Sequence, residues 1–278
     1  MLTQGERMES ALFSGFNQSI PFHRALSMIR NAGFSITALG GCLSHMDYTI
    51  KENLNIISTL LRNYDLRVDS VHAPFPEADY LFSLDKEERE KSIQHCKFAC
   101  DAANAVESSI VVLHIVQPYD IKDRPTQKKM EEEGKKSIES LIRYAERRNV
   151  KLALENGQRP WYDEVLTAFL KEFNSPQIGF CYDSGHAHVQ GSSFSLLKEF
   201  HNRLLTVHIH DNPGKDSHLL PYEGTIDWDE FKKIFHTINY SGSLLLEPHM
   251  ANSRFTDPVY FLKEAKKRGD KLLTLPTR

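Results

Sequence analysis

The sequence predicts an α/β protein, a closed (β/α)8 TIM barrel formed as a single domain by residues 1–278. Short apolar runs that favour buried strands alternate with helical patterns along the whole chain. Eight strand–helix repeats can be counted, which is the number that a closed barrel needs. The length suits one large domain, and neither a linker nor the Gly-rich first turn of many open doubly wound sheets is found.

The first four repeats occupy residues 11–148. Their strands are short apolar or β-branched runs, at 11–15, 35–39, 67–72 and 109–115. Their helices are longer amphipathic segments, at 21–31, 52–62, 83–104 and 126–148. Pro21 suits the first turn of the first helix, and Gly33 ends it. Ile56 and Leu60 are expected in the buried stripe of the second helix.

The last four repeats occupy residues 151–268. Their strands are almost wholly apolar, at 151–154, 178–182, 204–209 and 243–246. Their helices are expected at 163–173, 194–200, 227–238 and 258–268. Asp227 is a suitable N-cap for the seventh helix, and Pro258 opens the eighth. The long polar loops 116–126 and 212–225 follow the fourth and seventh strands, so both would lie over the mouth of a barrel.

The composition is that of an ordinary globular protein, with 40% hydrophobic and 26% charged residues. A net charge of -3 gives no overall basic field for nucleic acid, although a local patch could suffice. No stretch approaches the roughly 18 apolar residues of a membrane span, and residues 1–18 lack a signal-peptide pattern. Cys96 and Cys100 share a helical face and are expected to be reduced core residues. We therefore expect a cytoplasmic protein without a membrane partner, and leave open whether it forms a homo-oligomer.

Metal-type ligands close four successive apolar runs in the second half of the chain. These residues are Glu155, Asp183, His208 and Glu247. A buried carboxylate or imidazole is costly unless something pairs with it, and a divalent cation is the simplest partner that all four could share. Two glutamates, one aspartate and one histidine suit Mn²⁺ or Mg²⁺ and tolerate Co²⁺ or Zn²⁺.

Further potential ligands lie at strand ends and in the loops beyond them: His72, His114, His186, Asp216 and His218. The carboxyl ends of the strands in a parallel barrel share one face, so all nine candidates would meet in one cup. The extra histidines favour Zn²⁺ and more than one ion. A single strand-end histidine is more often a hydrogen-bonded core residue, which is the competing interpretation of His72 and His114 taken singly.

Two neighbours of His208 have less specific interpretations. His210 lies on the same side of the strand as His208, and is as compatible with a partner of a ligand or a substrate contact as with a ligand. Asp211 is interpreted as an acid that starts the following loop.

Several strings around these residues form a pattern: Val71-His72-Ala73-Pro74, Leu154-Glu155-Asn156, Asp183-Ser184-Gly185-His186, His208-Ile209-His210-Asp211-Asn212, Glu223-Gly224-Thr225-Ile226-Asp227-Trp228 and Leu246-Glu247-Pro248. This pattern resembles the xylose-isomerase-like TIM barrel superfamily. That superfamily holds sugar isomerases and epimerases, small-molecule dehydratases, and apurinic endonucleases of the endonuclease IV type. The resemblance covers nearly the whole chain and is more specific for the superfamily than for a substrate.

The isomerase and epimerase branch implies one metal ion, held by Glu155, Asp183, His208 and Glu247. It implies that the ion polarises a substrate carbonyl, that Glu155 and Glu247 transfer the proton, and that His186 bonds a substrate oxygen. On this resemblance we predict a divalent-metal-dependent isomerase or epimerase of a small sugar or sugar-like substrate. The sugar, and whether it carries a phosphate, stay open.

The endonuclease IV branch implies three zinc ions. His72 and His114 would share one with Glu155, the isomerase set would hold a second, and a third would bind the remaining candidates, His186, Asp216 and His218. Against hydrolysis of abasic DNA, the string Ala-Pro-Phe-Pro after His72 departs from that branch, and the loops lack groups of Arg and Lys for phosphates. A metal-dependent dehydratase or lyase of a related small acid is a second alternative. A binding protein without activity is a third, and the intact Glu155 and Glu247 argue against it.

Overall fold

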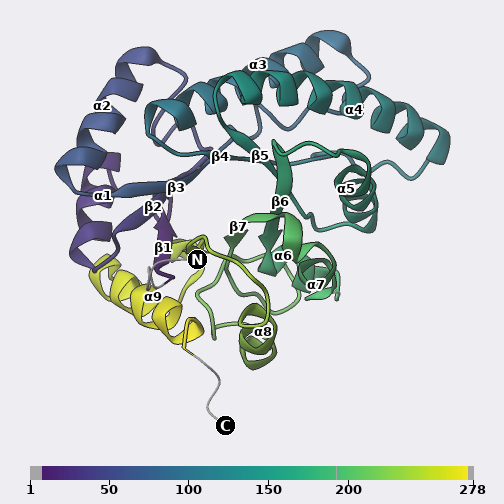
Figure 1. Cartoon of the computed structure of the whole chain (residues 1–278). Helices are drawn as coiled ribbons and strands as arrows, with labels where there is room; N and C mark the ends of the chain where they lie inside the picture. The colour runs from purple at the N-terminus through teal and green to yellow at the C-terminus, as the bar shows by residue number, and fades with distance from the viewer. Residues whose placement is uncertain (1–7, 192, 275–278) are drawn as a thin grey trace, which may run out of the picture.

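The computed structural model describes residues 8–191 and 193–274, so part of the segment 1–18 lies outside the described residues. Within them, eight parallel strands form one sheet in the order β7-β6-β5-β4-β3-β2-β1-β8. A parallel bridge between Ile209 and Leu246 joins the two outer strands and closes the barrel. Figure 1 shows the strands at the centre and the helices around them. The predicted (β/α)8 barrel is confirmed.

The elements follow one another as the repeats predict. The strands are β1 Ser10–Phe13, β2 Ile36–Leu39, β3 Arg67–His72, β4 Ile110–Leu113, β5 Lys151–Glu155, β6 Ile178–Asp183, β7 Leu204–His208 and β8 Leu244–Leu246. The α-helices are α1 Phe22–Asn31, α2 Lys51–Asn63, α3 Lys86–Ala105, α4 Arg124–Arg147, α5 Pro160–Glu172, α6 Ser184–Val189, α7 Ser195–Phe200, α8 Trp228–Phe235 and α9 Pro258–Leu272. Short 3-10 helices occupy His201–Arg203 and Met250–Asn252.

Three helical details differ from the sequence prediction. The buried stripe of α2 contains Ile57 and Leu61, whereas Ile56 is 51% exposed, so the predicted face was rotated by one residue. The third helix begins at Lys86 rather than at residue 83, because the side chain of Asp85 caps it by accepting from the backbone N–H of Glu88. The short helix α6 was not predicted, and it begins directly after β6 with the Asp183 side chain as its cap.

The core is continuous between the sheet and the helices. Strands β1, β2, β6 and β8 are buried along their whole length, as expected for a parallel sheet that helices cover on its outside. Cys96 and Cys100 are buried, which confirms their predicted place in the core. No described helix is long and apolar enough to cross a membrane.

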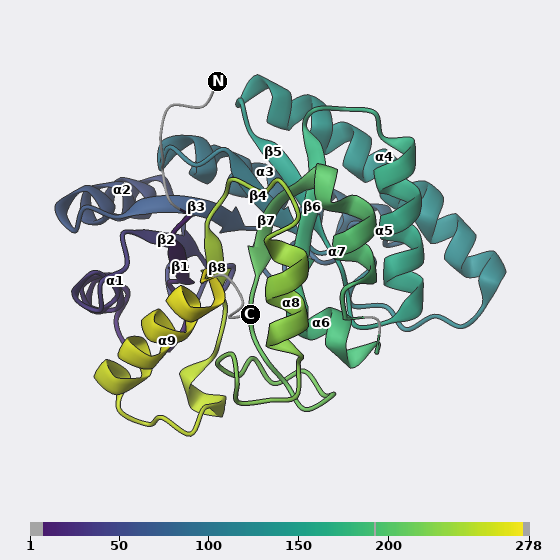
Figure 2. The same ribbon diagram turned by 60° about the horizontal axis from the view of Figure 1, so that its bottom comes forward.

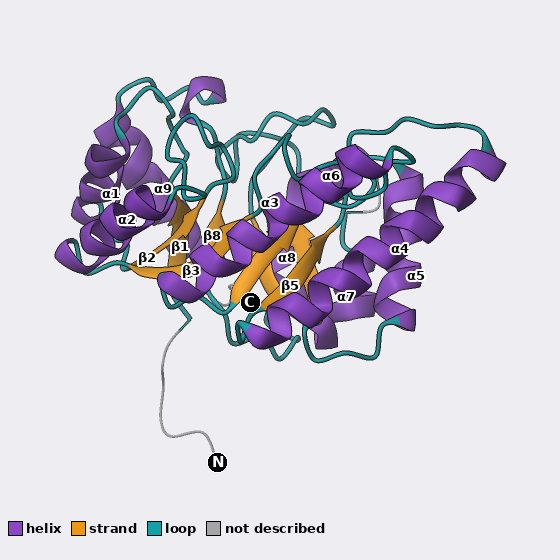
Figure 3. Ribbon diagram, turned by 90° about the horizontal axis from the view of Figure 1, so that it is seen from above, coloured by secondary structure: helices purple, strands orange, loops and turns teal. Residues whose placement is uncertain are grey.

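The loops that follow the strands gather over one end of the barrel (Figure 3). The long segment between β7 and α8 is the green loop at the bottom of the view in Figure 2. Its position is fixed by Asp211, which pairs with Leu219 in an antiparallel bridge. The functional side chains predicted from the sequence lie at this end.

Candidate metal centre

The register of the parallel strands brings the four main candidates together. Glu155 and Asp183 are the last residues of β5 and β6, and Asp183 lies beside His208 at the end of β7. Glu247 directly follows β8, where its N–H donates to the carbonyl of Ile209 over 3.0 Å. Four neighbouring strands thus place their terminal side chains in one cup.

These four side chains are spaced as ligands of one ion would be. The Nδ1 atom of His208 lies 3.4 Å from a carboxylate oxygen of Glu155 and 3.2 Å from one of Glu247. One ligand atom from each of the four residues lies within 4.8 Å of all the others. Ligands about 2.0–2.2 Å from a common ion are roughly 3–3.6 Å from their nearest neighbours, so the spacing fits.

A second group forms around the other oxygen of Glu155. The Nε2 atoms of His72 and His114 lie 3.4 and 3.7 Å from Oε2 of this carboxylate. The opposite nitrogen of His114 lies 2.9 Å from a carboxylate oxygen of Asp79, the arrangement in which a carboxylate orients a ligating histidine. Glu155 therefore lies between two groups of potential ligands.

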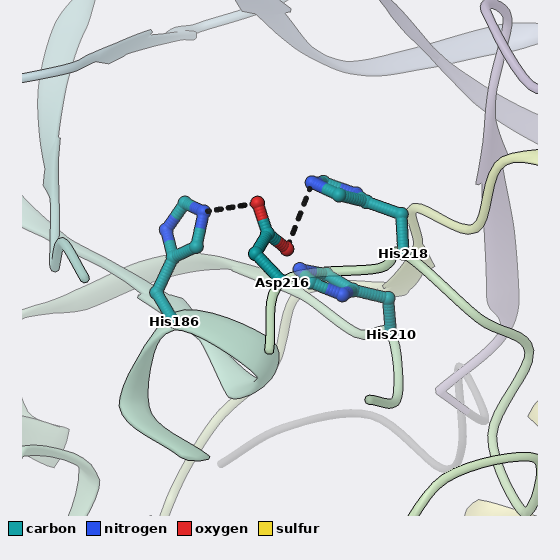
Figure 4. Close-up of side chains that lie close together, drawn as sticks. All are labelled: His186, His210, Asp216 and His218. Carbon is teal, nitrogen blue, oxygen red and sulfur yellow. Dashed lines mark ion pairs between the residues drawn. The ribbon is translucent and has the colours of Figure 1, made fainter. Parts of the chain in front are cut away.

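The third group contains His186, His210, Asp216 and His218, with ligand atoms within 4.8 Å of one another. Asp216 lies between the rings of His186 and His218, with oxygen–nitrogen distances of 3.9 and 3.5 Å (Figure 4). The side chain of Gln158 donates to the same carboxylate over 2.7 Å and fixes its orientation. The structure thus brings together all nine residues that the sequence analysis selected.

Backbone carbonyls determine which nitrogen of three histidines faces the cup. The Nδ1 atom lies 2.8 Å from the Ala73 carbonyl in His72, 3.0 Å from the Asn156 carbonyl in His186 and 2.9 Å from the Glu247 carbonyl in His218. A carbonyl oxygen only accepts, so Nδ1 carries a proton, and Nε2 is the nitrogen that could bind a cation. This tautomer is the one that a metal-binding histidine requires.

The cup also contains buried polar atoms that lack a hydrogen bond within the described residues, among them Glu155 Oε2, His208 Nδ1 and Asp216 Oδ1. Glu155 is 3% exposed and Asp183 is fully buried. Leaving such groups unpaired is costly, whereas a divalent cation would satisfy them. The residues therefore fit a metal ion on their geometry, tautomers and unsatisfied atoms.

The charges in the cup shift the pKa values of its members. Burial alone would raise the pKa of Glu155, but the neighbouring His208 and His72 hold it well below its usual range. Burial opposes the charged form of His218, yet the nearby carboxylates of Asp216 and Glu247 raise its pKa to about 10. His114 is affected similarly by Asp79, which raises its pKa to about 9. The acids of the cup thus attract positive charge strongly.

Two further histidines, His210 and His249, lie beside these candidate ligands. His210 is fully buried, and its Nε2 lies 3.0 Å from a carboxylate oxygen of Asp183. Its ring stacks on His218 with 3.8 Å between centroids, and His218 in turn stacks on His249 at 4.7 Å. A Cβ on Gly185 would lie 2.0 Å from the His210 ring, so the glycine of Asp-Ser-Gly-His makes room for this histidine.

Asp211 is fully buried, which corrects its interpretation as an acid that merely starts a loop. Its carboxylate accepts from the backbone N–H groups of Tyr222 and Ile226 and from the indole N–H of Trp228, at 2.9, 3.1 and 2.7 Å. The acid therefore holds the loop over the cup in place. The string His208-Ile209-His210-Asp211 was the sequence signal for His210 and Asp211, and it did not reveal their partners.

Comparisons with known proteins agree with this fold. An uncharacterized protein of Sinorhizobium fredii is 31% identical over 185 residues, which cover 63% of this chain and 58% of that protein. The crystal structure of the IolI protein with a bound zinc atom matches with a TM-score of 0.81 at 17% identity, over 96% of this chain and 98% of that one. The crystal structure of a D-tagatose 3-epimerase-like protein matches with a TM-score of 0.79 at 22% identity, over the same shares.

The alignment spans less than two thirds of the S. fredii relative, and the two solved structures are similar to this chain in fold. A family model described as xylose isomerase-like TIM barrel matches residues 26–267, from the first helix to the last. On this match, the chain belongs to the xylose isomerase-like TIM barrel family.

Proposed function

We propose that this protein is a divalent-metal-dependent isomerase or epimerase of a small sugar or a sugar-like polyol or keto compound. The grouping of Glu155, Asp183, His208 and Glu247 within 4.8 Å carries the proposal. Two similar structures support it by their own descriptions, one as a D-tagatose 3-epimerase-like protein and the other as a protein with bound zinc. The ligand types suit Mn²⁺, Mg²⁺, Co²⁺ or Zn²⁺.

The four residues would hold the ion, and the ion when bound would supply Lewis-acid polarisation of a substrate carbonyl. The carboxylates of Glu155 and Glu247 would remove a proton from the carbon beside that carbonyl and return it. Both acids have depressed pKa values despite burial, because His208 lies against each of them, so both are ionised before substrate binds. The Nε2 atom of His186 would accept a hydrogen bond from a substrate hydroxyl.

Deuterium wash-in from solvent tests this proposal. Metal-loaded protein incubated in D₂O with a panel of ketoses and aldoses, including D-tagatose and D-fructose, should introduce deuterium beside the carbonyl of at least one sugar. Mass spectrometry of the recovered sugars detects the label. Absence of label across the panel with every candidate metal would contradict the proposal.

Variants of the two glutamates locate the proton transfer. Glu155→Gln and Glu247→Gln should each lower the exchange rate at least about 10²-fold, the usual contribution of a positioned acid–base group. Glu164→Gln is a matched control, because Glu164 lies on the surface and pairs there with Arg124, 2.7 Å away. Full exchange in either cup variant would remove that glutamate from the mechanism.

A second candidate function is metal-assisted phosphodiester hydrolysis. The observation that favours it is the presence of two further ligand groups, around His72 and around Asp216. We propose that these residues, with His114, His186 and His218, bind additional ions. Metal analysis that finds close to three zinc ions per chain, together with nicking of an abasic duplex, would support hydrolysis. One ion per chain and no nicking would contradict hydrolysis, and the isomerase or epimerase proposal would then stand without this rival.

A further inference from the structure

His210 is fully buried and contacts members of two different ligand groups. Its Nε2 atom lies 3.0 Å from Oδ2 of Asp183, and its ring stacks on His218 with 3.8 Å between centroids. Asp183 belongs to the set that we call the first group, whose members are Glu155, Asp183, His208 and Glu247. His218 belongs to the third group, whose members are His186, His210, Asp216 and His218. One side chain therefore connects the two groups.

The contact with Asp183 fixes the orientation of its carboxylate. An ionised carboxylate only accepts, so Nε2 of His210 donates to Oδ2. Within the described residues this is the only hydrogen bond of the ring, because its buried Nδ1 atom has no partner. The other oxygen of Asp183 accepts from the backbone N–H of His186 over 2.6 Å. Two donors from different segments thus set the plane of a carboxylate that would bind an ion.

The ring of His210 is also the buried end of a column of four stacked rings. His218 lies on it within 8° of parallel, and His249 and Phe13 extend the column at 4.7 and 5.4 Å. His218 has a φ of 42°, a left-handed conformation that residues other than glycine seldom adopt. Its backbone alone does not favour this position, so the ring below it helps to hold Nε2 of His218 3.5 Å from the Asp216 carboxylate.

The same stacking argues against His210 as a ligand of an ion that His218 binds. An imidazole binds a cation through a nitrogen lone pair that lies in the plane of its ring. Two parallel rings 3.8 Å apart direct their lone pairs into separate planes, so these cannot converge on one ion. Because Nε2 of His210 also donates to Asp183, this residue supports ligands and is not itself one.

Backbone contacts keep His210 in place without an ion. The Ser184 hydroxyl accepts from the His210 N–H over 3.0 Å and donates to the His210 carbonyl over 2.7 Å. The Asn212 side chain donates to the Gly185 carbonyl over 2.9 Å. These bonds join the start of α6 to the segment after β7, so the position of the ring is set before any cation arrives.

We propose that His210 is a positioning residue for two ion sites at once. It orients Asp183 toward an ion of the first group, and it packs beneath His218 for an ion of the third group. The inference rests on the proposed function, because it takes the cup to bind divalent cations. Partners that orient a ligand in this way contribute about 10- to 100-fold to metal affinity.

Two substitutions separate the contacts of this side chain. His210→Ala removes both the N–H donor and the ring. His210→Gln also removes the ring, but its amide nitrogen reaches about as far as Nε2 of histidine and can still donate to Asp183. His23 is exposed in α1, so His23→Ala and His23→Gln are the matched controls.

Each ion is measured in a background that weakens the competing groups. Asp216→Asn removes a ligand of the third group, and Mn²⁺ binding to the oxygen-rich first group is then followed by the loss of the free-ion EPR signal. Glu155→Gln removes a ligand of the first group, and also one of the group around His72, and Zn²⁺ binding to the third group is then followed by calorimetry.

The expected result is a separation of the two effects. His210→Ala should raise both Kd values about 10- to 100-fold over the same background with His210 intact. His210→Gln should return the Mn²⁺ value to within about 3-fold of that background and leave the Zn²⁺ value raised. General damage to the fold would instead weaken both ions in both variants. If His210→Ala does not fold, the two Kd values of His210→Gln decide alone.

Several results would overturn the inference. They are Kd values in His210→Ala that equal those of the background, Mn²⁺ affinity in His210→Gln that is as low as in His210→Ala, and Zn²⁺ affinity in His210→Gln that equals the background. Absence of Zn²⁺ binding in the Glu155→Gln background would do the same, since no second ion would exist for His210 to support. The expected Kd values without deuterium exchange in any sugar would contradict the proposed function alone. Absence of binding of every candidate metal would contradict both.

Discussion

Glu155 has the largest number of contacts in the cup, because its two oxygens serve different neighbours. Oε1 lies 3.4 Å from both His186 and His208, and Oε2 lies 3.4 Å from His72. Asp216, in contrast, belongs only to the group with His186 and His218. Glu155 therefore lies between ligand groups, whereas Asp216 is part of a single group.

Replacing these acids should remove different numbers of ions. We expect Glu155→Gln to lose most of the bound metal, because it removes a charge from two ligand groups. Asp216→Asn should lose no more than the ion of its own group and keep the rest. Metal analysis after dialysis against a fixed ion concentration measures both. Equal metal contents in the two variants would show that Glu155 does not bridge the groups.

We expect Asp211 to contribute strongly to the free energy of unfolding, although it lies in a loop. Its two oxygens accept from backbone and indole donors, and Asp211→Asn would turn an amide N–H toward some of them. We expect a loss of about 3 kcal/mol in the free energy of unfolding, measured by urea denaturation. The exposed Asp229 is the control, and Asp229→Asn should change stability by less than about 0.5 kcal/mol. A loss below about 1 kcal/mol in Asp211→Asn would contradict this assignment.

Among single residues, those with an unusual local sequence context could be predicted, whereas those whose partners are distant in the sequence could not. Glu155 stands out because three apolar residues precede it in a strand. The role of Asp211 depends on Trp228, which lies 17 residues further along the chain and is brought to it by the fold of the loop. Stacking of His249 on His218 likewise depends on tertiary packing that no local pattern encodes.

Among the elements, α5 and α6 support the cup from outside. Asn156, at the end of β5, donates to the carbonyl of Asp183 and accepts from its N–H, which ties the two strand ends together. Asp163 in α5 accepts from the N–H of Gly157 and from the side chain of Gln190. This network fixes the loop that carries Gln158 toward Asp216.

The pH dependence of stability should show the titration of the Asp163 carboxyl group. Burial raises its pKa to about 6, although the hydrogen bonds from Gly157 and Gln190 oppose the shift. The folded state then binds more protons than the unfolded state between about pH 4 and 6, so this group lowers stability as the pH rises through that range. Asp163→Asn should remove up to about 3 kcal/mol of this decrease. Urea denaturation of metal-loaded wild type and variant at both ends of the range measures it, and parallel curves would contradict it.

The eight helices of the repeats were predictable in place, whereas the rotation of α2 and the short helix α6 were not. Ile56 and Ile57 are adjacent apolar residues, and a shift of one position turns a helix by about 100°, so composition alone did not select the buried one. Helix α6 has six residues and contains His186 and His188, and no apolar periodicity can develop over so short a segment.

For the whole molecule, the closed barrel was predictable because it depends on repeat number and strand order, which the sequence displays directly. The single-domain organisation and any self-association stay predictions, since association depends on surfaces that carry no comparable periodic signal. The charge of the cup, in contrast, has a consequence for the entire fold. Four carboxylates, those of Glu155, Asp183, Asp216 and Glu247, are gathered there.

Metal removal should destabilise the protein globally. An ion that binds only the folded state, at about 100 times its Kd, adds about 2.7 kcal/mol, or roughly 5–10 °C in Tm for a domain of this size. Calorimetry before and after chelation measures the difference, and restoring Mn²⁺ or Zn²⁺ should restore Tm. Unchanged Tm on chelation and reloading would argue against a resident ion.

The barrel closes where β8, only three residues long, meets the end of β7. At this seam Ile209 N–H donates to the Leu245 carbonyl, and Glu247 N–H donates to the Ile209 carbonyl, at 2.9 and 3.0 Å. An ion shared by His208 and Glu247 would span the seam and act as a clasp. Amide protection factors of Ile209 and Glu247 should therefore rise on metal loading more than those of Val111 and Leu152, deep in the opposite wall. The bound ion would then stabilise the closed barrel as well as take part in the reaction.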